Sequence, residues 1–121
     1  MFINCTNHPS ALWSEAQIAA TSVYGPIAEL PFPNVPPQAS EREVSQLGEE
    51  YAARILELKP SAVLCQGEMT LTYQIVRRLL ADGITVLAAC SERRTTERIN
   101  PDGSSQKVST FEFCKYRAYT E

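Results

Sequence analysis

The sequence predicts one α/β domain in which helices cover both faces of a mainly parallel sheet. Two observations lead to this fold class. Short runs that are apolar throughout, such as 62–65 and 84–89, alternate with longer segments whose apolar residues recur at helical spacing. The chain of 121 residues, 44% hydrophobic and 21% charged, is also large and apolar enough to bury a core of its own. We therefore treat residues 1–121 as a single domain.

The first strand and helix are expected near the N-terminus. Phe2 and Ile3 begin a buried strand, and Ser10 is expected to cap a helix, because serine at a helix start accepts a hydrogen bond from a free backbone N–H. The apolar positions of that helix are Leu12, Trp13, Ala16, Ala20 and Val23. The pair Gly25-Pro26 ends it, and 27–30 is expected to form a second strand.

A proline-rich loop and a second helix follow. Residues 31–37 contain four prolines, which lack the backbone donor that an inner strand needs, while Phe32 and Val35 can anchor the loop to a core. Ser40 and Glu43 have the spacing of a capping box, so a long helix is expected to begin there and to continue to about Leu58.

The second half of the chain is expected to hold two more parallel strands and a hairpin. Strand 62–65 leads into a helix over 70–81 that ends at Asp82-Gly83, and strand 84–89 follows. Residues 95–100 and 107–116 alternate with period two around a Pro-Asp-Gly-Ser turn, which predicts a β-hairpin. The order predicts a Rossmann-like three-layer sandwich whose hairpin extends the sheet or projects toward a second subunit.

Charge and composition exclude several classes of protein. A formal net charge of -3 argues against a sequence-independent binder of long nucleic acid, which needs a basic face. No apolar run approaches the roughly 18 residues of a membrane span, and the N-terminus lacks the features of a signal peptide. The four cysteines form no CxxC pair, which weakens a zinc hypothesis and suits a reduced cytoplasm.

Polar segments follow three of the apolar runs, and they form the candidate ligand site. In an open α/β sheet, ligands bind outside the carboxyl ends of the parallel strands, so the three segments are expected to meet at one crevice. The first offers amide, hydroxyl and imidazole groups ahead of a helix start that can receive phosphate, at Asn4, Thr6, Asn7 and His8. Turn and cap roles explain Asn7, His8 and Ser10 equally well.

The second segment has the same strand-to-helix position. Gly67 would allow a ligand to approach the backbone, and Glu68 would either compensate the helix dipole or bind adenine or ribose edges. Its expected ligand-binding residues are Gln66, Gly67, Glu68, Met69 and Thr70. The phosphate-loop and dinucleotide glycine motifs are absent, so no cofactor is expected.

The third segment contains Ser91, Arg93 and Arg94. Its two adjacent arginines give it the highest density of positive charge in the chain. An arginine fork at the end of a central strand matches phosphodiester oxygens, although a solvated hairpin base explains the same residues. His8 is the sole histidine and therefore the one side chain whose ordinary pKa lies near neutrality. A nucleophilic Cys5 would need His8 beside it, whereas a buried structural role for the cysteines is the simpler interpretation.

Four stretches of the chain together resemble a known family. They are residues 4–13 (NCTNHPSALW), 30–33 (LPFP), 66–72 (QGEMTLT) and 88–93 (AACSER). They resemble small ancillary proteins of type III CRISPR systems, minimal relatives of the CARF domains that sense cyclic oligoadenylate. The resemblance implies a CARF-like fold and a cytoplasmic homodimer that binds cyclic tetra-adenylate across its two-fold axis, with higher oligomers if a second dimer caps the ring.

Members of that group either cleave the ring, as ring nucleases, or sequester it. Cleavage without metal requires a ribose hydroxyl held in line with its phosphate, and His8 or Arg93 are the catalytic candidates. The three segments contain no lysine and no second histidine, and no metal-ligand set is expected. We therefore expect binding and sequestration that damps signalling. The alternatives are a metal-independent ring nuclease and an unrelated small ligand-binding or structural subunit.

Overall fold

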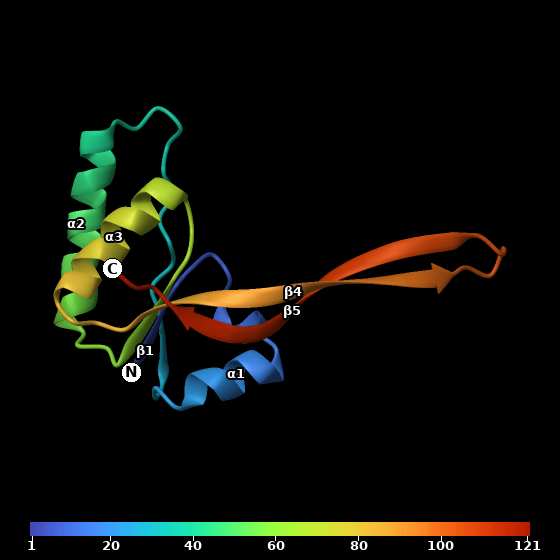
Figure 1. The fold of residues 1–121 in the computed structure, drawn as a ribbon. Coiled ribbons are helices and arrows are strands. Elements are labelled where there is room, and N and C mark those ends of the chain that lie inside the picture. Colours follow the sequence, from blue (N-terminus) through green and yellow to red (C-terminus); the bar gives the residue numbers. More distant parts are fainter.

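A computed structural model describes all residues, Met1–Glu121, as a mixed α/β fold (Figure 1). Its sheet has five strands in the order β2-β1-β3-β4-β5, of which β5 alone runs antiparallel to its neighbour. The strands are β1 (Phe2–Cys5), β2 (Ile27–Glu29), β3 (Ala62–Cys65), β4 (Val86–Ile99) and β5 (Ser105–Ala118). The predicted class and the mostly parallel sheet are confirmed, whereas the strand order and the hairpin match a Rossmann-like layout only in part.

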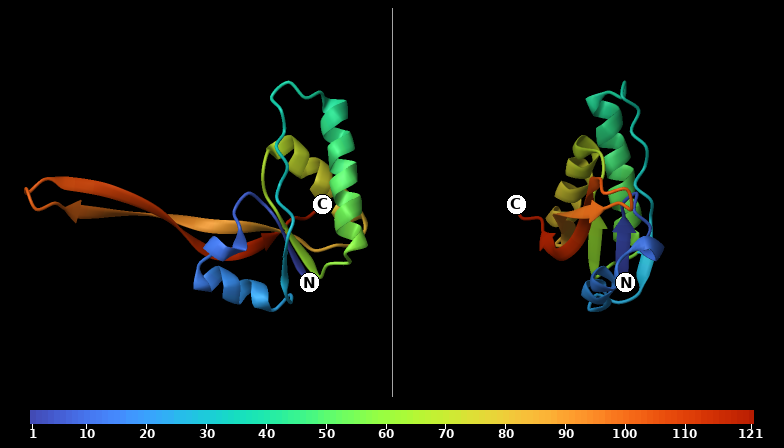
Figure 2. Two further views of the ribbon diagram at one scale, coloured as in Figure 1. Left: turned by 180° about the vertical axis from the view of Figure 1, so that it is seen from behind. Right: turned by 90° about the vertical axis from the view of Figure 1, so that its right-hand side faces the viewer.

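Helices lie on both sides of this sheet. Helix α1 (Glu15–Ser22) covers one face, and α2 (Glu41–Glu57) and α3 (Met69–Ala81) pack side by side on the other (Figure 2). None of the helices combines the length and the apolar composition that a membrane crossing requires.

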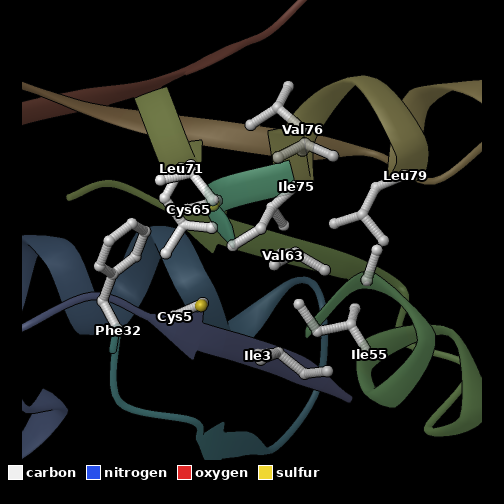
Figure 3. Packing of buried hydrophobic residues seen from close by; sticks show 13 residues of the cluster. Ile3, Cys5, Phe32, Ile55, Val63, Cys65, Leu71, Ile75, Val76 and Leu79 are labelled. Carbon is white, nitrogen blue, oxygen red and sulfur yellow. The ribbon is translucent and has the colours of Figure 1, made fainter. Parts of the chain in front are cut away.

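The alternation of side chains along the inner strands divides the core in two. Ile3, Val63 and Val86 face α2 and α3 in a cluster of 13 buried residues (Figure 3). Phe2 and Leu64, which neighbour them in the sequence, face the opposite way and pack with Trp13, Leu87 and Tyr116 in a cluster of five buried and four partly buried residues. The α1 side of the sheet is therefore less completely covered.

Most sequence-based element predictions are confirmed. Ser40 and Glu43 form the expected capping box at the start of α2. Phe32 is buried and anchors the proline-rich loop in the larger core cluster. Helix α3 ends before Gly83, whose φ of 75° is the left-handed conformation expected at a helix end.

The prediction for the first helix was wrong in its start and in its buried face. Residues Ser10–Leu12 form a short 3-10 turn, and α1 begins only after Ser14, whose side chain accepts from the Gln17 N–H. The helix buries Gln17 and Thr21, whereas Leu12 and Val23 are exposed. The reason is the Tyr116 hydroxyl, which lies 2.7 Å from the Thr21 hydroxyl and 3.3 Å from the Gln17 amide nitrogen.

The second correction concerns the hairpin. A separate strand over 84–89 and a separate hairpin were expected, but β4 is one strand of 14 residues paired with a β5 of equal length. A bulge lies between Cys90 and Ser91, where the periodicity of the sequence changes. Beyond the bulge the two strands leave the body of the protein, and we call residues 91–113 the arm (Figure 1).

Candidate functional site

The carboxyl ends of β1 and β3 form a topological switch point. The two strands are neighbours in the sheet, but the chain after β1 leads to α1 on one face and the chain after β3 leads to α3 on the other. A hollow of about 950 Å³ opens beside these ends on the α1 side. Residues from all three predicted segments line it, namely Thr6, Asn7, His8, Gln66, Gly67 and Ser91.

The loop after β1 is held by hydrogen bonds that converge on one carbonyl. The His8 carbonyl accepts from the Asn4 amide at 3.0 Å and from the Trp13 indole N–H at 3.0 Å. The Thr6 hydroxyl donates to the Asn4 side-chain oxygen at 2.7 Å and accepts from the His8 N–H at 3.1 Å. The loop is therefore preorganised before any ligand arrives.

Two predicted ligand contacts in this loop serve the loop itself. Asn4 is fully buried, and its amide also donates to the Glu29 carboxylate at 2.7 Å. The other Glu29 oxygen accepts from the Ser10 N–H, so the helix start expected there is closed to phosphate. Thr6 is buried, and its hydroxyl is hydrogen-bonded to the Asn4 side chain and the His8 N–H. These contacts favour the turn interpretation for Asn4, Thr6 and Ser10.

Asn7 and His8 present free side chains to the hollow. Both are exposed and line it, and no protein group bonds to their side chains. The true start of α1 also borders the hollow through Ser14, Ala16 and Gln17. Because the Ser14 hydroxyl satisfies only the Gln17 N–H, the preceding backbone donors of the helix stay open to an anion.

The loop after β3 contributes one donor and one structural glycine. The Gln66 side-chain oxygen accepts from the Ala89 N–H at 2.9 Å, which fixes the side chain and leaves its amide NH₂ without a protein partner. A side chain at Gly67 would meet the Phe32 ring at 2.4 Å. The close approach that requires glycine here is made by Phe32, not by a ligand as the sequence suggested.

Glu68, Met69 and Thr70 lie outside the hollow. The Glu68 carboxylate caps α3 by accepting from the Thr70 hydroxyl and from the N–H groups of Thr70 and Leu71. Those hydrogen bonds, with the Thr70 hydroxyl first, lower the pKa of Glu68. The geometry favours the capping interpretation of Glu68 over adenine or ribose binding. Met69 is exposed and lines a second hollow of about 690 Å³ along α3.

The two arginines of the third segment differ in position. Arg93 pairs with Phe111, which lines the hollow, and Ser91 on the same face of β4 lines it too. Arg93 donates to the Ser109 hydroxyl at 3.2 Å and is otherwise free. Arg94 points to the opposite face, where its guanidinium contacts Glu112 at 2.9 Å and Glu92 at 3.7 Å. The predicted fork is therefore split: Arg93 shares the strand face of Ser91 and Phe111, whereas Arg94 is held by glutamates, of which Glu112 also borders the hollow.

Sequence reasoning missed the aromatic wall of the hollow. Trp13, Phe111 and Phe113 line it together with the residues above. From the sequence, Trp13 is expected only as an apolar position of the first helix, and no binding role is assigned to Phe111 or Phe113. The available signal was period two, because Phe111 and Phe113 are two residues apart in a strand and so share one face.

The structure also bears on acid, base and metal chemistry. Cys5 is buried in the core cluster on the α2 and α3 side, next to Cys65 in the paired strand, so a Cys5-His8 catalytic pair is wrong. The hydrogen bond with the Cys5 thiol and burial raise the pKa of Cys65. No group of three or more histidine, cysteine, aspartate or glutamate side chains is arranged to hold a metal ion.

Comparison with known proteins places the chain in a family. A family model described as "Uncharacterized protein MJ1673 family" matches residues 1–117, which is nearly the whole chain. The chain belongs to the MJ1673 family. No curated protein and no solved structure gives a match.

Proposed function

We propose that this member of the MJ1673 family binds a cyclic oligoadenylate, cyclic tetra-adenylate by preference, in the hollow at the switch point. The observation that carries the proposal is the composition of that hollow. Unpartnered polar groups and aromatic rings line it together, in about 950 Å³ at the ligand-binding end of an α/β sheet. The resemblance to CARF-like ancillary proteins, and with it a Rossmann-like description of the fold, favours a cyclic oligoadenylate as the ligand.

Each part of an oligoadenylate finds a matching group. Phe111 and Phe113 offer ring faces for adenine, since base stacking on aromatic side chains stabilises single-stranded nucleotides without base pairing. The amides of Asn7 and Gln66 can bond to the edge of a base. The open donors at the start of α1 and the Arg93 guanidinium can receive phosphate.

Sequestration fits this site better than rapid cleavage. The ionisable side chains that line the hollow are His8 and Glu112, the Glu112 carboxylate is held in an ion pair by Arg94, and neither a second histidine nor a lysine completes an acid and base pair there. We therefore propose slow or absent turnover, so that the protein lowers free cyclic oligoadenylate in the cytoplasm. We further propose that it does so as a homodimer, because a two-fold ring is matched by a two-fold assembly.

The experiment uses radiolabelled cyclic tetra-adenylate and reads gel retardation and linear product in the same samples. We expect retardation at micromolar protein and little product, both unchanged by EDTA. Absence of retardation and of product would overturn the proposal. Retardation together with multiple turnovers that are lost in His8→Ala would identify a ring nuclease instead of a sequestering protein.

Arg93→Ala and Arg94→Ala form a matched pair for this assay. Arg93 lies on the face of the hollow, so its loss should weaken binding about tenfold and reduce the salt dependence of binding by about one phosphate contact. Arg94 lies on the other face in ion pairs with glutamates, so its loss should change binding less than threefold, within the range of a surface substitution. Equal effects would contradict the assignment of Arg93 to the site.

A further inference from the structure

The arm leaves one edge of β4 without a partner. β4 pairs with β3 only through Val86 and Leu87, and beyond them the β3 side of β4 meets no strand along the arm. Figures 1 and 2 show the outer part of the arm extending beyond all three helices. A two-stranded ribbon is marginally stable alone in water, and a free strand edge is a template for pairing with another chain.

The hydrogen-bonding groups at this edge belong to the odd-numbered residues. Ala89 donates its N–H to Gln66 on the β3 side, and Asn100 donates its N–H across the hairpin to Ser104. Because backbone groups of an antiparallel strand alternate between its two edges, the odd residues between Ser91 and Ile99 direct their N–H and C=O groups to the free edge.

The charges of this strand are complementary to themselves about Thr95. The sequence from Ser91 to Ile99 is SERRTTERI. If a second copy of the strand runs antiparallel with Thr95 opposite Thr95, then Arg93 lies opposite Glu97 and Glu92 lies opposite Arg98. By symmetry each pair occurs twice, and directly opposite side chains of unlike charge stabilise a strand pair.

Neighbouring registers that keep the free backbone groups opposed are unfavourable. Centring the two-fold axis on residue 94 places Arg94 opposite Arg94, and centring it on residue 96 places Arg94 opposite Arg98 twice. Sliding one strand by a single residue, which moves the centre to a point between two residues, would set edge-directed groups against groups already bonded to β5. Among the registers that the backbone alternation allows, the charge pattern therefore favours the centre at Thr95.

We propose that two copies of this chain pair through β4 of their arms, antiparallel about a two-fold axis at Thr95, to give a four-stranded ribbon. About ten backbone hydrogen bonds would form between the copies, since each opposed odd pair exchanges two. This proposal rests on the homodimer of the proposed function, whose interface it names, and does not depend on which ligand the hollow binds. The partner is a second copy because the complementary sequence is the strand itself.

This pairing would bring a residue of the second copy to the hollow. Ile99, which is 79% exposed, would lie opposite Ser91 in the wall of the hollow of the other copy. The pairing thus accounts for an exposed apolar side chain near the end of a polar arm.

A charge-swap series with sedimentation velocity tests the interface. We expect the wild-type protein to be a dimer, and Arg93→Glu or Glu97→Arg alone to weaken dimerisation about tenfold or more, because each sets two like-charge pairs together. The double swap, with both substitutions in one chain, restores unlike pairs and should restore the dimer. Restoration distinguishes pairing at this register from general disruption of the arm.

Two results would overturn the proposal. One is a wild-type protein that is monomeric at tens of micromolar, and the other is a dimer that both single reversals leave intact. Arg77→Glu on the exposed surface of α3 is the control and should leave dimerisation unchanged. Loss of the dimer in this variant would assign the interface to α3. Circular dichroism of each variant verifies that the body remains folded.

Cross-linking supplies a second, independent readout. In a Cys114→Ser background, Thr95→Cys would place two thiols opposite each other at the axis, within the roughly 4.4–6.8 Å between Cα atoms that a disulfide spans. Mild oxidation should give a covalent dimer on a non-reducing gel. Thr110→Cys on β5 lies away from the axis and should not cross-link. Equal cross-linking of the two variants would contradict the register.

Discussion

The body and the arm of this molecule share two strands but differ in what holds them. Val86 and Leu87, at the start of β4, are buried between helices, whereas Ser91 to Arg98 of the same strand are exposed on both faces. The body closes its own core, whereas the arm is held by its internal ladder, by the two ion pairs of Arg94 and by the packing of Phe113 on Tyr116 at its base. Stability therefore resides in the body, while the arm is the part for which we propose contacts with ligand and with a second copy.

Truncation of a large side chain should separate the two regions most strongly. Leu79→Ala removes a fully buried side chain from the larger cluster and should lower the free energy of unfolding by about 3–4 kcal/mol. Phe111→Ala, on an arm side chain that is 74% exposed, should cost less than about 0.5 kcal/mol. Urea denaturation measures both, and equal costs would break the comparison.

Asn4→Asp should destabilise the body strongly at neutral pH. The new carboxylate would stand where the Asn4 amide now donates to Glu29 at 2.7 Å, and two like charges there would cost about 2–3 kcal/mol. Repulsion raises the folded-state pKa of such a pair, so stability should recover as the pH falls and a proton is shared. Thermal unfolding of Asn4→Asp at pH 7 and pH 5 tests the sign; a variant less stable at pH 5 than at pH 7, relative to wild type, would contradict it.

Two glycine substitutions compare steric and conformational causes. Gly67→Ala brings a methyl group into the Phe32 ring and should cost about 1–3 kcal/mol by overpacking. Gly103→Ala, in the turn of the arm, meets no atom but sits at a φ of 88°, so it should cost about 1 kcal/mol. Phe32→Leu should recover part of the loss in Gly67→Ala and none of the loss in Gly103→Ala, as measured by denaturant midpoints.

The smallest effect is expected at the cap of α3. Glu68→Ala removes the acceptor for the Thr70 and Leu71 N–H groups and should cost below about 1 kcal/mol at pH 7. Since hydrogen bonds lower the folded-state pKa of Glu68, its contribution is present at neutral pH and is lost as the pH falls through that pKa. The stability difference between wild type and Glu68→Ala should therefore shrink on acidification. A difference that grows would contradict the capping role.

The sequence predicted those elements whose causes are local. The capping box of Ser40 and Glu43 and the fully apolar run of β3 each contain their own explanation. Helix α1 was harder because it buries Gln17 and Thr21 against the hydroxyl of Tyr116, a residue about a hundred positions away. The continuity of β4 was hidden by the change from apolar to polar residues at Cys90 and Ser91, where the register against β5 shifts without ending the strand.

The candidate site divides in the same way. The switch-point rule brought His8 and Gln66 to one hollow, because it follows from strand order alone. The role of Asn4 depends on Glu29, and the need for glycine at position 67 depends on Phe32, so neither could be read from its own segment. The split of Arg93 from Arg94 follows from strand alternation and was predictable once both were placed in one strand.

The fluorescence of Trp13 during a titration with cyclic tetra-adenylate tests the central claim most directly. Trp13 is the sole tryptophan, lines the hollow, and donates its indole N–H to the His8 carbonyl, so a ligand in the hollow must alter its surroundings. We predict a saturable change in fluorescence at micromolar ligand. His8→Ala should weaken the free energy of binding by about 1–2 kcal/mol, the loss of one hydrogen bond. A flat titration under conditions where the protein retards the labelled ring would show that the ligand binds elsewhere and would contradict the account.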